Sequence, residues 1–153
     1  MKLAEALCIR ADLQKRSLQL EERIKSVAKI QEGDEPDEVP EDLFAELHST
    51  MVQLQDIVFR INATNMRALC DGIPITQMIA RKDALSWEIN TLRNVLKVAS
   101  SRESRYSRNE IKYVKTVDVL ELRKKVDRMS AELRKLDLKI QESNWTVELE
   151  SED

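Results

Sequence analysis

The scarcity of turn-forming residues is the feature that most constrains this chain. Its 153 residues include 2 Gly and 3 Pro, whereas average usage is about 7% Gly and about 5% Pro. Sheet-rich and α/β folds need a turn roughly every 8 to 15 residues, and such turns usually contain Gly, Pro, Asn or Asp. Long stretches of this sequence lack that punctuation. The sequence therefore predicts an all-α fold built from long helices.

The same count excludes several classes of catalytic and cofactor-binding motif. Phosphate-binding loops, dinucleotide-binding turns and nucleophile elbows need two or three glycines a few residues apart, but glycine occurs at positions 33 and 72. His48, Cys8 and Cys70 cannot supply four nitrogen and sulfur ligands to a zinc ion. We expect no catalytic residues, no metal and no cofactor, and we favour a protein without enzymatic activity.

Apolar runs are too short for membrane insertion. None exceeds the four residues 6–9, whereas a spanning helix needs about 20 apolar residues and a signal peptide an apolar core of about 7 to 15. We therefore expect a cytoplasmic protein with free thiols and no stable membrane insertion.

Heptad spacing of apolar residues predicts an antiparallel bundle of four long helices in one domain, residues 1–153. The helices are expected at about 2–31, 40–70, 76–100 and 118–143. Gly33 is expected to cap the first helix, Pro40 to open the second and Asp118 to cap the fourth. The core stripe of the second helix is predicted as Phe44, Leu47, Met51, Leu54, Val58 and Ile61. The third helix carries a second apolar stripe opposite its core stripe, made of Ala80, Ala84, Trp87, Val95 and Val98.

Three segments lack a helical pattern. The loop 32–39 is acidic; its carboxylates could collect Ca²⁺, but EF-hand spacing is missing, so we interpret it as a solvated loop. The connection 101–117 is basic, and its second half, 111–117, is rich in strand-forming residues. The tail 145–149 alternates like a strand.

The basic connection has two interpretations. Its arginines and lysines, with Tyr106 and Tyr113 for stacking, could follow nucleic-acid phosphates. The net charge of the chain is −3, which argues against nucleic acid, so we favour charge pairing with the acidic loop, within or between subunits.

A polar layer is predicted where hairpin geometry aligns five polar residues: Arg10, Asn62, Asn65, Lys82 and Asp83. A buried guanidinium needs acceptors, which a carboxylate and two amide oxygens would provide. We favour a structural layer that sets helix register. The alternative is a small-ligand or anion pocket, or an enzyme site.

Assembly into a homodimer, or a multiple of one, is the partner prediction. The strand-like segments have unpaired edges, and the second stripe of the third helix needs a cover. The residues expected at the interface are Trp87, Val95, Val98, Ile111, Tyr113, Trp145 and Val147.

Several sequence strings resemble a known family. Residues 2–7 (KLAEAL), 31–36 (QEGDEP), 60–62 (RIN), 116–119 (TVDV) and 141–146 (QESNWT) are similar to small bacterial proteins named septicolysin. The resemblance spans nearly the whole chain and implies a bacterial, all-helical protein without assigned catalytic residues. The family name suggests a membrane-active cytolysin, which we keep as an alternative to a self-associating scaffold.

Overall fold

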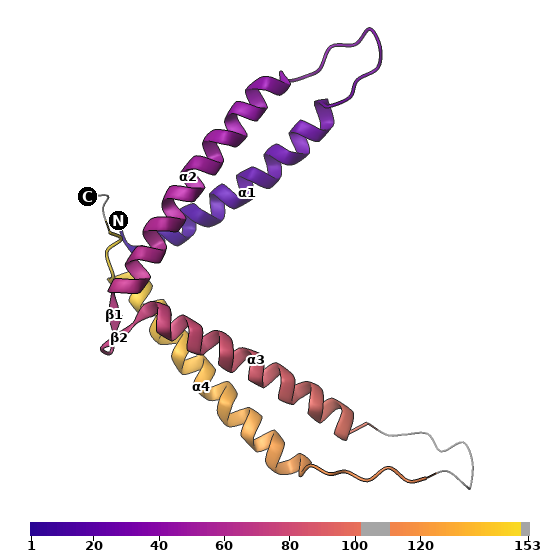
Figure 1. The fold of residues 1–153 in the computed structure, drawn as a ribbon, viewed down its shortest axis with the longest axis vertical. Helices are drawn as coiled ribbons and strands as arrows, with labels where there is room; N and C mark the ends of the chain where they lie inside the picture. The colour runs from indigo at the N-terminus through magenta and orange to yellow at the C-terminus, as the bar shows by residue number, and fades with distance from the viewer. Residues whose placement is uncertain (102–110, 151–153) are drawn as a thin grey trace. The chain divides into compact units, whose positions relative to one another are not determined.

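The computed structural model describes residues 1–101 and 111–150. These residues form four α-helices: α1 (Leu3–Val27), α2 (Pro40–Arg67), α3 (Ile75–Ala99) and α4 (Val119–Thr146), shown in Figure 1. A short antiparallel strand pair, β1 (Leu69–Cys70) and β2 (Ile73–Pro74), connects α2 to α3. The protein has the all-α fold that the sequence predicts.

The chain divides into two compact units. The first unit consists of Met1–Ile75 and Gln141–Asp153, so it holds α1, α2, the strand pair and the end of α4. The second unit, Thr76–Ile140, holds almost all of α3 and the rest of α4. Each unit is an antiparallel helix pair. The packing of both pairs into one bundle domain stays a prediction.

An aliphatic seam forms the core of the first unit. Leu3, Leu13, Leu20 and Val27 of α1 are buried at the spacing that the sequence predicts, and Leu20 and Val27 pack with Leu43 of α2. Burial of these side chains is the main favourable term in the pairing of the two helices, at roughly 1.5 to 3 kcal/mol for each large side chain.

The predicted core stripe of α2 is partly wrong, because at every second turn the buried residue precedes the predicted one by one position. The buried residues are Leu43, Thr50, Ile57, Ile61 and Thr64, whereas Phe44 and Met51 are exposed. The buried threonines explain the shift. Their hydroxyls donate to the carbonyl oxygens of Glu46 and Arg60, each at 2.8 Å, so both polar groups are satisfied inside the seam.

An apolar seam between α3 and α4 forms the core of the second unit. Met78, Ile89, Val126 and Leu136 are buried. Polar contacts also cross between the two helices: Arg81 pairs with Glu132, Lys82 pairs with Asp137, and the Arg93 guanidinium donates to Ser130 Oγ at 3.3 Å. These contacts fit the antiparallel arrangement of α3 and α4, and because they are solvent-exposed they contribute modestly to stability.

Helix ends follow local chemistry in part. Pro40 opens α2, and the Asp118 carboxylate accepts the backbone N–H of Glu121 at 3.0 Å, as predicted. Gly33 does not cap α1, because α1 already ends at Val27. Residues 28–33 are exposed, and a helical turn without packing contacts frays. Asp71 and Gly72 both have positive φ, 53° and 79°, the conformation that a two-residue hairpin turn requires.

The segment 111–117 forms neither strand nor helix. A strand needs a partner, and no described segment of the same chain supplies one. The pairing of this edge with a second chain stays a prediction. The first half of the basic connection, residues 102–110 with Tyr106, lies outside the described residues.

The predicted strand at 145–149 is also largely wrong, because α4 continues through Thr146. Beyond it, residues 146–150 pack against residues 1–3, and we call this contact the terminal clasp. Leu3 N donates to Val147 O at 2.9 Å, and Leu149 N donates to Met1 O at 2.8 Å. Through these bonds the backbones of Lys2 and Glu148 form an isolated antiparallel β-bridge. The first of these bonds gives a partner to a backbone N–H at the start of α1, which the helix itself leaves unpaired.

The clasp also reaches the end of α2. Arg60 Nε donates to the carbonyl oxygen of Glu150 at 3.1 Å, and Glu150 N donates to the hydroxyl of Thr64 at 3.0 Å. Leu149 is buried. The clasp therefore joins the start of α1, the end of α2 and the end of α4 within the first unit.

An ion pair carries much of the charge in the clasp. Lys2 Nζ lies 2.6 Å from a carboxylate oxygen of Glu148. The hydrogen bond from Lys2, and a second one from the amino terminus, lower the pKa of Glu148 below its ordinary value of 4.5. The side chains are solvent-exposed, so the pair contributes modestly at high salt.

Replacing Leu20 by Ala is expected to lower the free energy of unfolding by about 2 to 5 kcal/mol, because Leu20 is fully buried and truncation leaves a cavity. Leu18 is 63% exposed on the same helix, so Leu18→Ala is the matched control, with a change below about 0.5 kcal/mol. Urea denaturation followed by circular dichroism measures both. Equal losses in the two variants would contradict the assigned seam.

Acid is expected to weaken the terminal clasp. Since the folded-state pKa of Glu148 is lowered, its contribution to stability is present above about pH 4.5 and is lost as the pH falls through that pKa. Glu148→Gln should therefore show a smaller drop in melting temperature than the wild type between about pH 7 and about pH 3. Glu35→Gln, in the acidic loop, is the control and should follow the wild type. A variant at 148 that follows the wild type would count against the clasp.

Candidate interaction surface

The second apolar stripe of α3 is exposed. We call Ala80, Ala84, Trp87, Val95 and Val98 the outer face of α3. Trp87 is 77% exposed and Val98 76% exposed. Isolated apolar residues on a surface are ordinary, whereas a stripe of exposed apolar residues along one helix face is a candidate interaction surface. The sequence predicts this stripe correctly and predicts that something covers it.

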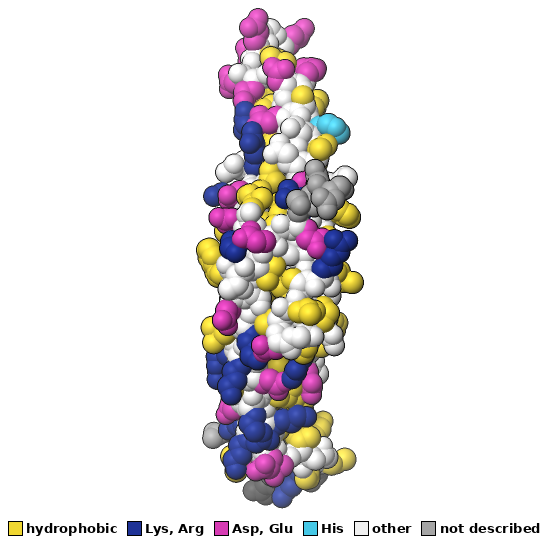
Figure 2. Space-filling view, turned by 90° about the vertical axis from the view of Figure 1, so that its left-hand side faces the viewer, with side chains coloured by type: hydrophobic (Ala, Val, Ile, Leu, Met, Phe, Trp, Pro, Cys, Tyr) yellow, Lys and Arg dark blue, Asp and Glu magenta, His cyan; other side chains and the backbone are white. Residues whose placement is uncertain are grey.

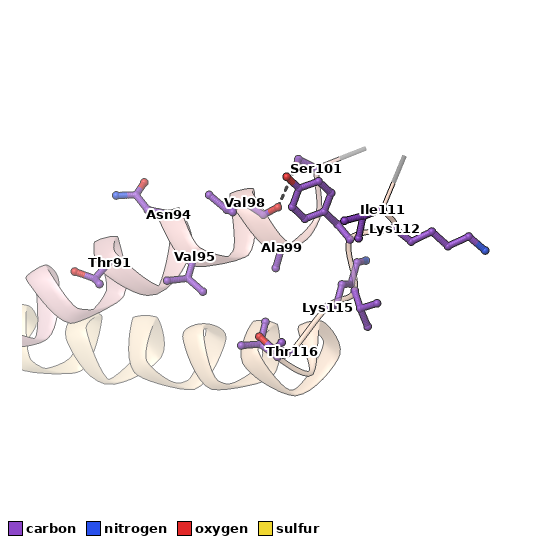
Figure 3. A pocket seen from close by; sticks show the side chains of 13 residues that line it. Thr91, Asn94, Val95, Val98, Ala99, Ser101, Ile111, Lys112, Lys115 and Thr116 are labelled. Atoms are coloured by element: carbon purple, nitrogen blue, oxygen red, sulfur yellow. Dashed lines mark hydrogen bonds between the residues drawn. The ribbon is translucent and has the colours of Figure 1, made fainter. Parts of the chain in front are cut away.

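A groove of about 780 Å³ lies at the C-terminal end of this face. Figure 3 shows its two walls, one formed by the end of α3 from Thr91 to Ala99 together with Ser101, and one formed by 111–117. The second wall contributes Ile111, which is 92% exposed, and Tyr113. Four of the predicted interface residues, Val95, Val98, Ile111 and Tyr113, therefore lie around this groove, whereas Trp87 lines a second hollow.

The groove is apolar with a basic edge. The part of its lining that the structure describes includes Lys112 and Lys115 and no carboxylate. A second hollow of about 400 Å³ lies further along α3, where Asp83 and Trp87 contribute to its lining. The two hollows share Thr91 and Asn94. A continuous depression thus follows α3, and its groove end suits apolar side chains accompanied by acidic groups.

Two other predicted interface residues belong to the first unit. Trp145 is exposed in the last turn of α4, whereas Val147 is half-buried and its carbonyl oxygen is bonded within the terminal clasp. The interface role of both residues stays a prediction.

A further exposed stripe lies on α2. We call Phe44, Met51, Val52, Phe59 and Met66 the outer face of α2, and all five are exposed. The sequence analysis placed Phe44 and Met51 in the core and missed the other three. The spacing of seven residues from Val52 to Phe59 to Met66 is the signal that could have identified this face.

The residues of the predicted polar layer have different environments. Arg10, Asn62 and Asn65 belong to the first unit, and Lys82 and Asp83 belong to the second. Lys82 pairs with Asp137, while Asn62 and Asp83 are exposed. Arg10 Nε and Asn65 Oδ1 are buried, and neither has a hydrogen-bond partner among the described residues.

The next features concern metal ligands, nucleophilic side chains and membrane-spanning helices. No group of three His, Cys, Asp or Glu side chains in residues 1–101 and 111–150 is arranged to hold a metal ion. His48 and Cys8 are exposed. Within the same residues, no helix is long and apolar enough to cross a membrane.

Replacing Arg10 by Met is expected to raise the melting temperature. A buried polar group without a partner costs about 1 to 3 kcal/mol, and methionine removes that group while keeping the apolar stem. Arg16→Met, on the same helix, is the matched control, because Arg16 pairs with Glu46 at 2.8 Å and its loss should lower stability slightly. Differential scanning calorimetry compares the two. A clear loss of stability at position 10 would support a structural polar layer instead.

Comparison with known proteins adds a family. No curated protein matches the sequence significantly. A crystal structure of a functionally unknown conserved protein from Corynebacterium diphtheriae is similar, with 40% sequence identity, a TM-score of 0.90, and coverage of 98% of this chain and 99% of that chain. Residues 10–149 match the model of a family of unknown function, DUF6847. The chain therefore belongs to the DUF6847 family.

Proposed function

We propose that this protein is a non-enzymatic helical protein of the cytoplasm that self-associates through the outer face of α3 and the groove beside it. The observation that carries the proposal is the exposure of Trp87 and Val98 on one face of α3, next to a groove lined by apolar residues. Removing such surface from water is worth roughly 25 cal/mol for each Å² buried. A second copy of the chain is the partner that is always present at the same concentration.

Further observations support this proposal. Ile111 and Tyr113 face the same groove and are almost fully exposed, so association would also cover the segment 111–117. Most soluble homo-oligomers have closed two-fold symmetry, which covers the same patch on both partners. Cys8 is a free thiol, which suits a reducing compartment.

The alternative functions have less support. A small-anion site around Arg10 would use Lys82 and Asp83, but Lys82 pairs with Asp137 and Asp83 is exposed. A cytolysin suggested by the resemblance to septicolysin would need an apolar surface that enters lipid. Dye release from vesicles of anionic lipid tests that alternative directly.

The double variant Trp87→Glu/Val98→Glu is expected to convert a dimer, or a multiple of one, into monomers, because each glutamate would have to be buried without a partner. Multi-angle light scattering after size exclusion gives the mass in solution. Leu138→Glu on α4 is the control, since Leu138 is 68% exposed but lies outside the outer face of α3. Circular dichroism should show unchanged helix content in both. A monomeric wild type, or a double variant with unaltered mass, would overturn the proposal.

A further inference from the structure

We infer that the outer face of α2 in one copy docks against the outer face of α3 in a second copy, and that two such contacts close a two-fold dimer. This inference rests on the proposed self-association and names the surfaces that carry it. The outer face of α2 is a surface that the sequence analysis did not assign to any interface.

The geometry of α2 explains why this face is available. At about 100° per residue, the outer face lies roughly 140° around the helix from the buried seam. Pairing with α1 uses the seam, which includes Leu43 and Ile57, and leaves Phe59 69% exposed. A helix with two apolar faces needs a second neighbour.

The two outer faces have comparable lengths. From Phe44 to Met66 the face on α2 extends about 33 Å, and from Ala80 to Val98 the face on α3 extends about 27 Å, at 1.5 Å per residue. Their shapes are also complementary. The α2 face presents large side chains such as Phe59, whereas the α3 face presents two alanines and lies beside two hollows.

Charge favours contact between unlike units of two copies. Residues 76–140 contain 16 Lys and Arg against 9 Asp and Glu, a net charge of +7, while the rest of the chain contains 9 against 19, a net charge of −10. In Figure 2, acidic side chains gather around the loop between α1 and α2, and basic side chains gather over the second unit. Contacts between two like units would instead be opposed by their charge.

Charge also sets the direction of the contact. Glu41 and Asp42 precede Phe44 at the start of α2, and neither forms an ion pair among the described residues. Among the described residues, the lining of the groove at the end of α3 includes Lys112 and Lys115 and no carboxylate. Placing these acids beside these lysines makes α2 antiparallel to α3 of the partner copy.

Area explains why the contact should occur twice. A helix face of about 33 Å by about 10 Å offers roughly 330 Å², whereas a stable interface buries about 800 Å² on each partner. Reciprocal contacts roughly double the area and close the assembly. With a single contact, one copy would keep a free outer face of α3 and the other a free outer face of α2. Further copies could then add to these faces and form an open-ended assembly.

Mixing two variants tests the exchange. The first variant, Val52→Glu/Phe59→Glu, removes the outer face of α2, and the second, Trp87→Glu/Val98→Glu, removes that of α3. Each variant alone should be monomeric, because both of its contacts contain one altered face. An equimolar mixture should form a heterodimer that is weaker than the wild-type dimer but tighter than the self-association of either variant, because one of its two contacts then has two intact faces. Native mass spectrometry distinguishes the heterodimer by mass, and Leu18→Glu on α1 is the control that should stay dimeric.

A charge exchange provides the second measurement. Glu41→Lys/Asp42→Lys should weaken the dimer at least about tenfold, and adding Lys112→Glu/Lys115→Glu to the same chain should restore most of the affinity. Sedimentation equilibrium gives the dissociation constants, and circular dichroism confirms that the helices remain.

The outcomes separate this inference from the proposed function. If the α3 variant is monomeric while the α2 variant still dimerises, self-association through α3 stands and the role of α2 is overturned. If the mixture forms no heterodimer and the charge exchange restores nothing, the reciprocal contact is overturned. If the wild type is monomeric, both proposals are overturned together.

Discussion

The structure depends on one constraint: a pair of long helices can bury one stripe from each helix. In the first unit the paired stripes meet in an aliphatic seam around Leu20 and Leu43, and that burial holds α1 to α2. The pairing cannot use an apolar face on the far side of either helix. Both α2 and α3 carry such a face, and this surplus is the basis of the proposed association.

The seam tolerates polar groups where the backbone satisfies them. Thr50 and Thr64 are almost fully buried, and each hydroxyl donates to a carbonyl one turn earlier on the same helix. Arg10 differs, because its buried Nε has no partner among the described residues. The buried polar groups of the first unit therefore differ in whether the backbone of the same helix satisfies them.

The terminal clasp shows how short segments can organise long helices. Residues 146–150 contribute few apolar side chains, yet they give hydrogen-bond partners to the start of α1 and the end of α2. Three chain segments far apart in sequence meet there. Their contact depends partly on exposed charge, so we expect the clasp to respond to pH and salt more than the seams do.

Part of the candidate interaction surface could be predicted from the sequence. The second stripe of α3 followed from helical spacing, since residues three, four and seven positions apart share a face in any helix. The outer face of α2 was not recognised, because Phe44 and Met51 fit a core stripe as well as a surface stripe. Spacing alone does not show that a threonine, whose hydroxyl bonds to the backbone, is buried in the core while a larger apolar side chain beside it is exposed.

The sequence by itself determined the all-α class, the presence of four long helices and most core stripes, because these depend on local propensity and on the period of the helix. Tertiary structure decided which stripe of α2 is buried, that residues 111–117 are not a strand within one chain, and that the tail continues α4 before it meets the start of α1. The physical reason is the same in each case. A helix or strand is selected locally, but burial and pairing depend on neighbours that are distant in the sequence.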